Sequence, residues 1–364
     1  MQSAALRQRC RCPPHRADGL SRPFSRADAK VPDSSACRGH LRLLGNAHAR
    51  IYPQMGGDAC IWRLAANTLE TVFIDEVFAS PGGLTTREQL LSVMSRKTLA
   101  AHMKAGAIFR VWHGVYSLSP PDAVGRLAGL DLMTGKTIVA CMGTAAQLYG
   151  FDTERDDRIH ILDPGVRMRP TTALAVHQRI GAPLRRVEGR LVTAPAWTAV
   201  EIARTLRRPR ALGTLDAALR CGACTAAELD AAVREQKGRR GIVKVRELLN
   251  HADGRAESPM ESEARLVFID GGLPTPELQY EIVDRCGDLW RVDFAWPEAM
   301  VVAEYESMEW HASPAALKHD RTKTSRLQEC GYSVIPIIVD DVRHKPFDLV
   351  ARIFCHLNRA ELAG

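Results

Sequence analysis

Apolar and polar positions become regular near Leu69, and the first regular stretch predicts three short helices followed by a β-hairpin. The helices are expected at residues 71–79, from the capping-box pattern Thr86-Arg-Glu-Gln89 onward, and from Ser95 to a stop at Gly106. Two runs rich in β-branched and aromatic residues, 108–112 and 115–118, flank a His-Gly turn and read as paired strands. The pattern therefore predicts a small helical unit that a hairpin completes.

Three small helices and a hairpin over residues 69–119 are the elements of a winged helix-turn-helix, and the charges of this unit are compatible with DNA. Arg96 and Lys97 begin the third helix, at the end that would point toward base edges, whereas Lys104 and Arg110 would flank phosphates. Exposed Lys and Arg are also common on helices that are simply solvated, and winged helices also dock on proteins. DNA contact and protein docking are therefore both retained as interpretations.

Residues 120–250 predict an α/β middle domain. Strands are expected at 137–141 and 158–162, and helices at 195–206, 212–220, 226–235 and 241–250, the third of them opened by the capping box Thr225-Ala-Ala-Glu228. Nothing in this stretch forms a catalytic constellation. The charge run Lys237-Gly-Arg-Arg240 reads as a loop and as a linker to the C-terminal region.

Residues 251–364 predict a helix, three strands, a helix and a strand in that order. Ser258 is the expected N-cap of the first helix, with Pro259 at its first position and Glu261 at its third. The other elements are expected as a strand at 279–284, a hairpin within 292–306, a helix at 313–330 and a final strand at 332–339. On the long helix Lys318, Arg321 and Ser325 share a face, which forms a cationic edge suited to phosphate.

The hairpin VDFAWPEAMVVAEYESMEWH carries carboxylates within an apolar setting. A turn centred on Pro297 and Glu298 would place Val292 opposite Ala303 and make Asp293 and Glu304 diagonal neighbours on the face away from the core. Two carboxylates held that close repel each other unless a proton, a basic residue or a metal ion lies between them. Oxygen ligands with room for water suit Mg²⁺. The alternative is that Arg291 and nearby lysines neutralise an exposed face.

Composition places these elements in a soluble chain of two or three domains. The 364 residues are 46% hydrophobic, and no apolar run reaches the length of a membrane span or forms an export signal, so a cytoplasmic protein with reduced cysteines is expected. The net charge of +7 resides in residues 1–68, which hold 11 Lys and Arg against 4 Asp. Those residues read as a disordered basic tail or as sequence upstream of the true start. Affinity for phosphate elsewhere must come from local patches.

Several segments resemble known families. SPMESEARL, RVDFAWPE, EYESMEWH and HDRTKTSRLQECGYSVI resemble the C-terminal domain of actinobacterial proteins related to very-short-patch repair endonucleases, which have the PD-(D/E)xK nuclease fold. GGLTTREQLL through RVWHGVYSL resembles the winged-helix domain of AbiEi-type antitoxins. The resemblance covers about residues 70–345. It implies an α+β multi-domain protein with a winged helix-turn-helix, an α/β middle domain and a C-terminal αβββαβ domain.

The nuclease resemblance implies a role for each matching residue. Asp293 and Glu304 would hold Mg²⁺ or Mn²⁺, with Glu261 as a further ligand, and His311 would position or deprotonate the attacking water. The chain departs from the motif at Glu306, where the family has a lysine. The candidates to replace that lysine are Lys318, Arg321 and His311, and the remaining alternative is an inactive site.

Three functions are retained as hypotheses. The first is a Mg²⁺-dependent endonuclease directed to DNA by the winged helix. The second is a non-enzymatic regulator, antitoxin-like and paired with a toxin, whose C-terminal nuclease fold is inactive. The third is a protein-interaction adaptor, which would lack any DNA affinity that falls with salt.

Overall fold

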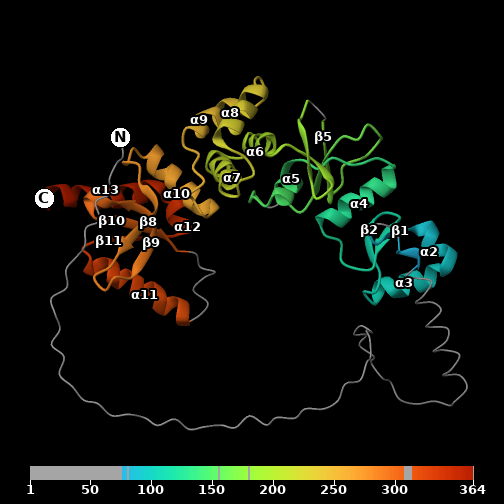
Figure 1. Cartoon of the computed structure of the whole chain (residues 1–364), viewed down its shortest axis with the longest axis horizontal. Helices are drawn as coiled ribbons and strands as arrows, with labels where there is room; N and C mark the ends of the chain where they lie inside the picture. The colour runs from blue at the N-terminus through green and yellow to red at the C-terminus, as the bar shows by residue number, and fades with distance from the viewer. Residues whose placement is uncertain (1–75, 80–81, 155, 179–180, 307–313, 364) are drawn as a thin grey trace, which may run out of the picture. The chain divides into compact units, whose positions relative to one another are not determined.

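The computed structural model describes residues 76–79, 82–154, 156–178, 181–306 and 314–363. Within these ranges the chain is a mixed α+β protein whose strands form several separate sheets (Figure 1). The expected α+β class is therefore confirmed at that level. The expected helix at 71–79 lies largely outside the described residues.

The first folded unit contains β1 (Leu84–Thr86), α2 (Arg87–Val93), α3 (Arg96–Lys104), β2 (Phe109–Trp112) and β3 (Val115–Ser117). The capping box is confirmed, since Thr86 Oγ1 accepts from Gln89 N and Gln89 Oε1 accepts from Thr86 N. Ser95 caps α3 in the same way, through Thr98 N. The strands pair in the order β1-β3-β2. The short β1 was not expected from the sequence.

The next unit begins with α4 (Ala123–Thr134), α5 (Met142–Tyr149), β4 (Ile159–Leu162), β5 (Leu174–His177), β6 (Leu184–Val187) and β7 (Arg190–Thr193). The expected strand at 137–141 is wrong. Only Ala140 makes isolated bridges, to Ile161 and Val192. The reason is local, because Asp131 Oδ1 accepts from Ile138 N at 2.7 Å and thereby ties this stretch to α4 instead of to a sheet.

Four helices complete this unit, α6 (Pro195–Ala203), α7 (Arg208–Arg220), α8 (Ala226–Glu235) and α9 (Ile242–Leu249). They pack around one apolar core that includes Leu212, Leu215 and Leu229. The four expected helices are confirmed, with ends that differ by a few residues. The run 237–240 is not a linker, because it forms the turn between α8 and α9 inside this helical group.

The C-terminal elements are α10 (Pro259–Asp270), β8 (Glu277–Val283), β9 (Leu289–Trp296), η1 (Pro297–Ala299), β10 (Val301–Tyr305), α11 (Pro314–Glu329), β11 (Ser333–Ile337), α12 (Val339–Arg343) and α13 (Pro346–Ala363). The sheet order is β11-β10-β9-β8, with β10 and β11 parallel and the other pairs antiparallel. Helices cover both faces, α10 and α13 on one and α11 on the other (Figure 1). The sequence analysis did not predict α12 and α13.

The hairpin register differs by two residues from the expected one. Ala303 pairs with Phe294, and Val301 pairs with Trp296. The connection is longer than a two-residue turn, because η1 and the left-handed Met300 (φ 51°) both belong to it. The second face is also not open, since Val302 packs with Leu327 of α11. The same register, continued by one residue, sets Asp293 directly opposite Glu304.

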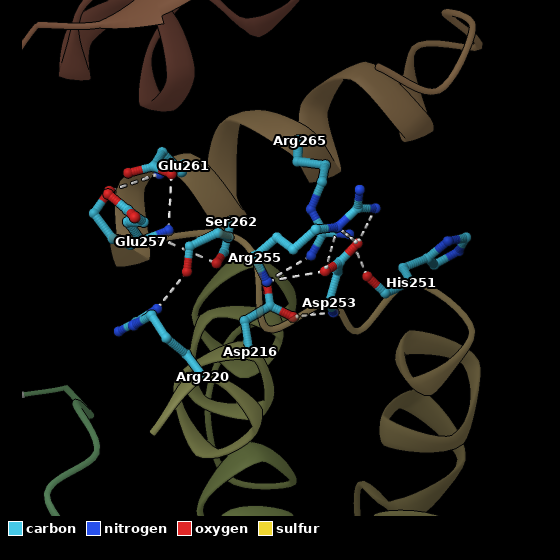
Figure 2. A network of polar contacts seen from close by, with 11 residues as sticks. Asp216, Arg220, His251, Asp253, Arg255, Glu257, Glu261, Ser262 and Arg265 are labelled. Atoms are coloured by element: carbon cyan, nitrogen blue, oxygen red, sulfur yellow. Dashed lines mark hydrogen bonds and ion pairs between the residues drawn. The ribbon is translucent and has the colours of Figure 1, made fainter. Parts of the chain in front are cut away.

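A buried polar network joins α7 to α10 (Figure 2). Arg265 Nη2 lies 2.5 Å from Asp216 Oδ2, and the two side chains are 5% and 0% exposed. Arg265 also donates to the carbonyl of His251, while Asp216 Oδ1 accepts from Asp253 N at 2.8 Å. The pair therefore fixes both the helix α10 and the loop that leads into it.

A second ion-pair cluster lies on another side of α10. The Glu263 carboxylate is 4% exposed and contacts Arg210 of α7 at 2.9 Å and Arg343 of α12 at 3.0 Å. Charged groups are buried at this level almost only when they are paired. The rotation of α10 about its axis is thus specified by charge pairs as well as by its apolar contacts.

Breaking the Asp216–Arg265 pair should destabilise the protein strongly. Asp216→Ala leaves a buried guanidinium without a counter-charge, so the free energy of unfolding should fall by about 3–5 kcal/mol in urea denaturation followed by circular dichroism. The double variant Asp216→Leu/Arg265→Met should lose much less than the two single changes together. Arg255→Ala, which removes an exposed pair with Asp253, is the control and should change stability by less than about 1 kcal/mol. Additive losses in the double variant would contradict this account.

Candidate functional site

The acidic candidates converge where α10, β9 and β10 meet. Asp293 Oδ2 accepts from Tyr305 N at 2.8 Å, which fixes the carboxylate against the neighbouring strand. Glu261 is 7% exposed, and its Oε2 accepts from Glu257 N at 2.8 Å. Gln279 lies between them, with Nε2 at 2.9 Å from Glu261 Oε2 and 3.5 Å from Asp293 Oδ1. The sequence thus placed Glu261, Asp293 and Glu304 in one region, and it missed Gln279.

Gln279 has an unusual backbone for its residue type. Its φ of 52° lies in the left-handed region, which favours glycine and is costly for most other residues. This conformation occurs on β8, at the residue whose side chain joins two buried carboxylates. The local strain therefore accompanies the placement of the Gln279 amide.

The lysine of the site is Lys323, which the sequence patterns did not single out. Its Nζ lies 2.7 Å from Glu304 Oε1, with the two side chains 17% and 21% exposed. A signal for it was present, because Leu327 is the buried residue of α11 and Lys323 precedes it by four positions on the same helical face. Lys318 and Arg321 point elsewhere, since both are exposed and line a shallow hollow on α11 with Ser325.

The remaining residues that the sequence suggested for this site do not join the carboxylates. Glu306 is exposed at the end of β10, where its N–H donates to Ile337 O at 2.7 Å. His311 lies outside the described residues. Arg291 does not neutralise the hairpin, because its guanidinium contacts Glu257 Oε2 at 2.7 Å.

Burial raises the pKa of all three site carboxyls. For Glu261 the negative charge of Asp293 raises the pKa further. For Glu304 the ammonium of Lys323 opposes the effect of burial on the pKa, and the same lysine acts on Asp293. Carboxyls with raised pKa values in a partly enclosed site are typical of functional positions, although structural charge networks also produce them.

Candidate ligands for a cation are limited to this carboxylate pair. Across the described ranges, no group of three or more His, Cys, Asp and Glu side chains is arranged to hold a metal ion. Mg²⁺ in phosphate-processing sites is commonly held by one or two carboxylates, with water and substrate oxygens completing the shell. Asp293 and Glu304, with Lys323 beside them, are compatible with that mode of binding.

The four cations expected to contact DNA are all at the surface. Arg96, Lys97 and Lys104 are exposed on α3, and Arg110 is exposed on β2. The helix turns its Leu99 into the core and has no acidic residue in its first turn. Its outer face is therefore cationic and free of acidic residues at the end that Ser95 caps.

A histidine pair in the middle unit is a contact that the sequence patterns did not predict. His160 Nδ1 and His177 Nε2 lie 2.9 Å apart, and His160 Nε2 lies 2.9 Å from Asp156 Oδ2. Burial lowers the pKa of both imidazoles. Register explains why sequence could not show the contact, since it depends on the parallel pairing of β4 with β5.

Neutralising Glu261 should stabilise the protein at neutral pH. A carboxyl whose folded pKa is raised binds its proton more tightly when folded, so its effect on stability becomes unfavourable as pH rises through the unfolded pKa toward the folded one. Glu261→Gln should therefore raise the free energy of unfolding at pH 7.5 by on the order of 1 kcal/mol and by much less at pH 4, as measured by urea denaturation. Glu257→Gln, on a half-exposed side chain, is the matched control. A loss of stability at pH 7.5 in Glu261→Gln would contradict the assignment.

None of the helices in the ranges that the structure describes is long and apolar enough to cross a bilayer.

Comparison with known proteins assigns one segment and the family. Residues 138–251 match the family model of the AbiEi antitoxin C-terminal domain. The chain is 63% identical over 271 residues to the uncharacterized proteins MT2308 and Rv2248 of Mycobacterium tuberculosis, strains CDC 1551 and H37Rv. That alignment covers 74% of this chain and 100% of each relative. The chain belongs to the family of these two mycobacterial proteins, and it carries a segment of the AbiEi antitoxin type.

Proposed function

We propose that the protein is a DNA-binding regulator of the AbiEi antitoxin kind, in which residues 84–117 act as a winged helix-turn-helix. The observation that carries the proposal is the outer face of α3, where Arg96, Lys97 and Lys104 are exposed on a helix capped by Ser95. The β2–β3 hairpin, with Arg110, is the wing. The AbiEi-type segment at 138–251 supports this role, and a toxin protein is the partner that such a role implies.

Removing the two cations at the start of α3 should weaken DNA binding. Each lost phosphate contact lowers the slope of log K against log salt by about 0.9, so Arg96→Gln/Lys97→Gln should lower it by roughly 2 and reduce affinity by about 10-fold or more. Fluorescence anisotropy with duplexes from the region upstream of the protein's own gene measures both quantities. Arg167→Gln/Arg169→Gln, which removes two exposed cations of the 163–170 loop, should bind as the native protein does. Equal binding by all three proteins would contradict the proposed role of α3.

We propose as a second function that the C-terminal unit hydrolyses DNA phosphodiesters as a PD-(D/E)xK-type site. One specific observation favours it, namely that Asp293, Glu304 and Lys323 meet although they come from β9, β10 and α11. Asp293 and Glu304 would hold the Mg²⁺, which when bound supplies charge neutralisation at the phosphate and acidifies water. Lys323 would stand in for the lysine that Glu306 replaces, because its ammonium is already beside Glu304. It would then pair with a phosphate oxygen.

Cleavage of supercoiled plasmid in Mg²⁺ or Mn²⁺ tests the second function. The native chain should nick the plasmid, whereas Asp293→Ala and Lys323→Ala should each lower the rate at least 100-fold, a loss of about 2.7 kcal/mol in transition-state stabilisation. Lys318→Ala is the matched control from the same helix and should retain activity. If the native chain binds DNA without cutting it, the C-terminal unit is an inactive nuclease fold and the regulator proposal stands alone.

A further inference from the structure

Two ten-residue segments of the AbiEi-type region hold an unusual excess of positive charge. Residues 201–210 (EIARTLRRPR) and 237–246 (KGRRGIVKVR) together contain nine Lys and Arg and a single carboxylate, Glu201. The chain beyond residue 68 is close to neutral as a whole. The excess is therefore local, and it becomes a surface feature only if the fold brings the two segments together.

The fold does bring them together, through close backbone contact. Gly241 has a φ of 85°, and a Cβ on it would lie 2.2 Å from Arg204 O, so only glycine permits this approach. Arg204 Nη1 donates to Arg240 O at 3.3 Å, and Lys244 Nζ donates to Leu206 O. The α6–α7 connection and the α8–α9 turn thus form one surface.

Five of the nine cations have partners that use up their charge or their donors. Glu201 binds both Arg204 and Arg239. Arg208 pairs with Asp270 and Arg210 with Glu263, while Lys244 donates to Leu206 O. These contacts fix the scaffold of the two turns.

The other four cations remain at the surface. Arg207, Lys237, Arg240 and Arg246 are exposed, and none of them forms an ion pair within the described part of the chain. Exposed Glu235 and Glu247 are the acidic neighbours on the same helices, and they leave the surface positive. The rigid backbone beneath holds these four cations in place at low entropic cost.

We propose that this surface, defined by Arg207, Lys237, Arg240 and Arg246, is a second DNA-contacting surface that binds the phosphate backbone of a duplex irrespective of sequence. Three of its four residues are arginines, whose planar guanidinium matches two phosphate oxygens at once. The proposal rests on the DNA-binding function proposed above. It does not depend on α3 or on the carboxylate site.

The experiment measures binding of the full chain to a 25-base-pair duplex of arbitrary sequence, across a range of NaCl concentrations, by fluorescence anisotropy. Arg207→Gln/Arg240→Gln should lower the slope of log K against log salt by about 2 and weaken binding roughly 10-fold at low salt. Thermal unfolding should be unchanged, because both side chains are exposed and neither forms an ion pair among the described residues. Arg185→Gln/Arg186→Gln, on exposed positions of β6, is the matched control and should bind as the native chain does.

The outcomes separate this proposal from the function on which it rests. If Arg96→Gln/Lys97→Gln weakens binding while Arg207→Gln/Arg240→Gln does not, the second surface is overturned and the role of α3 survives. If only Arg207→Gln/Arg240→Gln weakens binding, the second surface survives without the role of α3. If poly-L-glutamate competes as well as the duplex, the surface is a site for acidic protein and the proposal is overturned.

Discussion

The buried pair of Asp216 and Arg265 is the constraint on which the rest of the structure depends. An unpaired charge at either position would cost several kcal/mol, so α7 and α10 must meet in one geometry. The pair also holds the loop before α10, through Asp253 N and His251 O. That loop supplies Glu257 N, which binds Glu261. The AbiEi-type segment and the carboxylate site are therefore linked through one helix that both share.

The carboxylate site is consequently enclosed, which changes its chemistry. Helices cover both faces of the sheet, and burial raises the pKa of Asp293, Glu304 and Glu261. Lys323 reaches Glu304 from the helix that covers the second face. A site of this kind can receive a cation and a phosphate, or it can persist as a self-neutralised remnant. The cationic surfaces on α3 and on the 204–246 turns are compatible with DNA in either case.

Sequence predicted what is local and missed what is not. Caps at Thr86, Ser95 and Ser258 were readable because the donor and acceptor lie within three residues. The hairpin register failed by two because Met300 adopts a left-handed conformation that composition did not suggest. Lys323 and the Asp216–Arg265 pair join segments far apart in sequence, and a single sequence carries no record of such pairings. The three carboxylates of the candidate site were thus placed together correctly, while its basic residue was assigned to the wrong turn of the helix.

Hydrogen–deuterium exchange of the full chain, with and without duplex DNA, tests the central claim of DNA binding most directly. The account predicts that DNA slows exchange in residues 95–104 and 109–117, and again in the two turns at 204–210 and 237–246. Exchange in β6 and β7 should not change. Unaltered exchange at 95–117 in the presence of saturating DNA, or protection confined to other segments, would contradict the account.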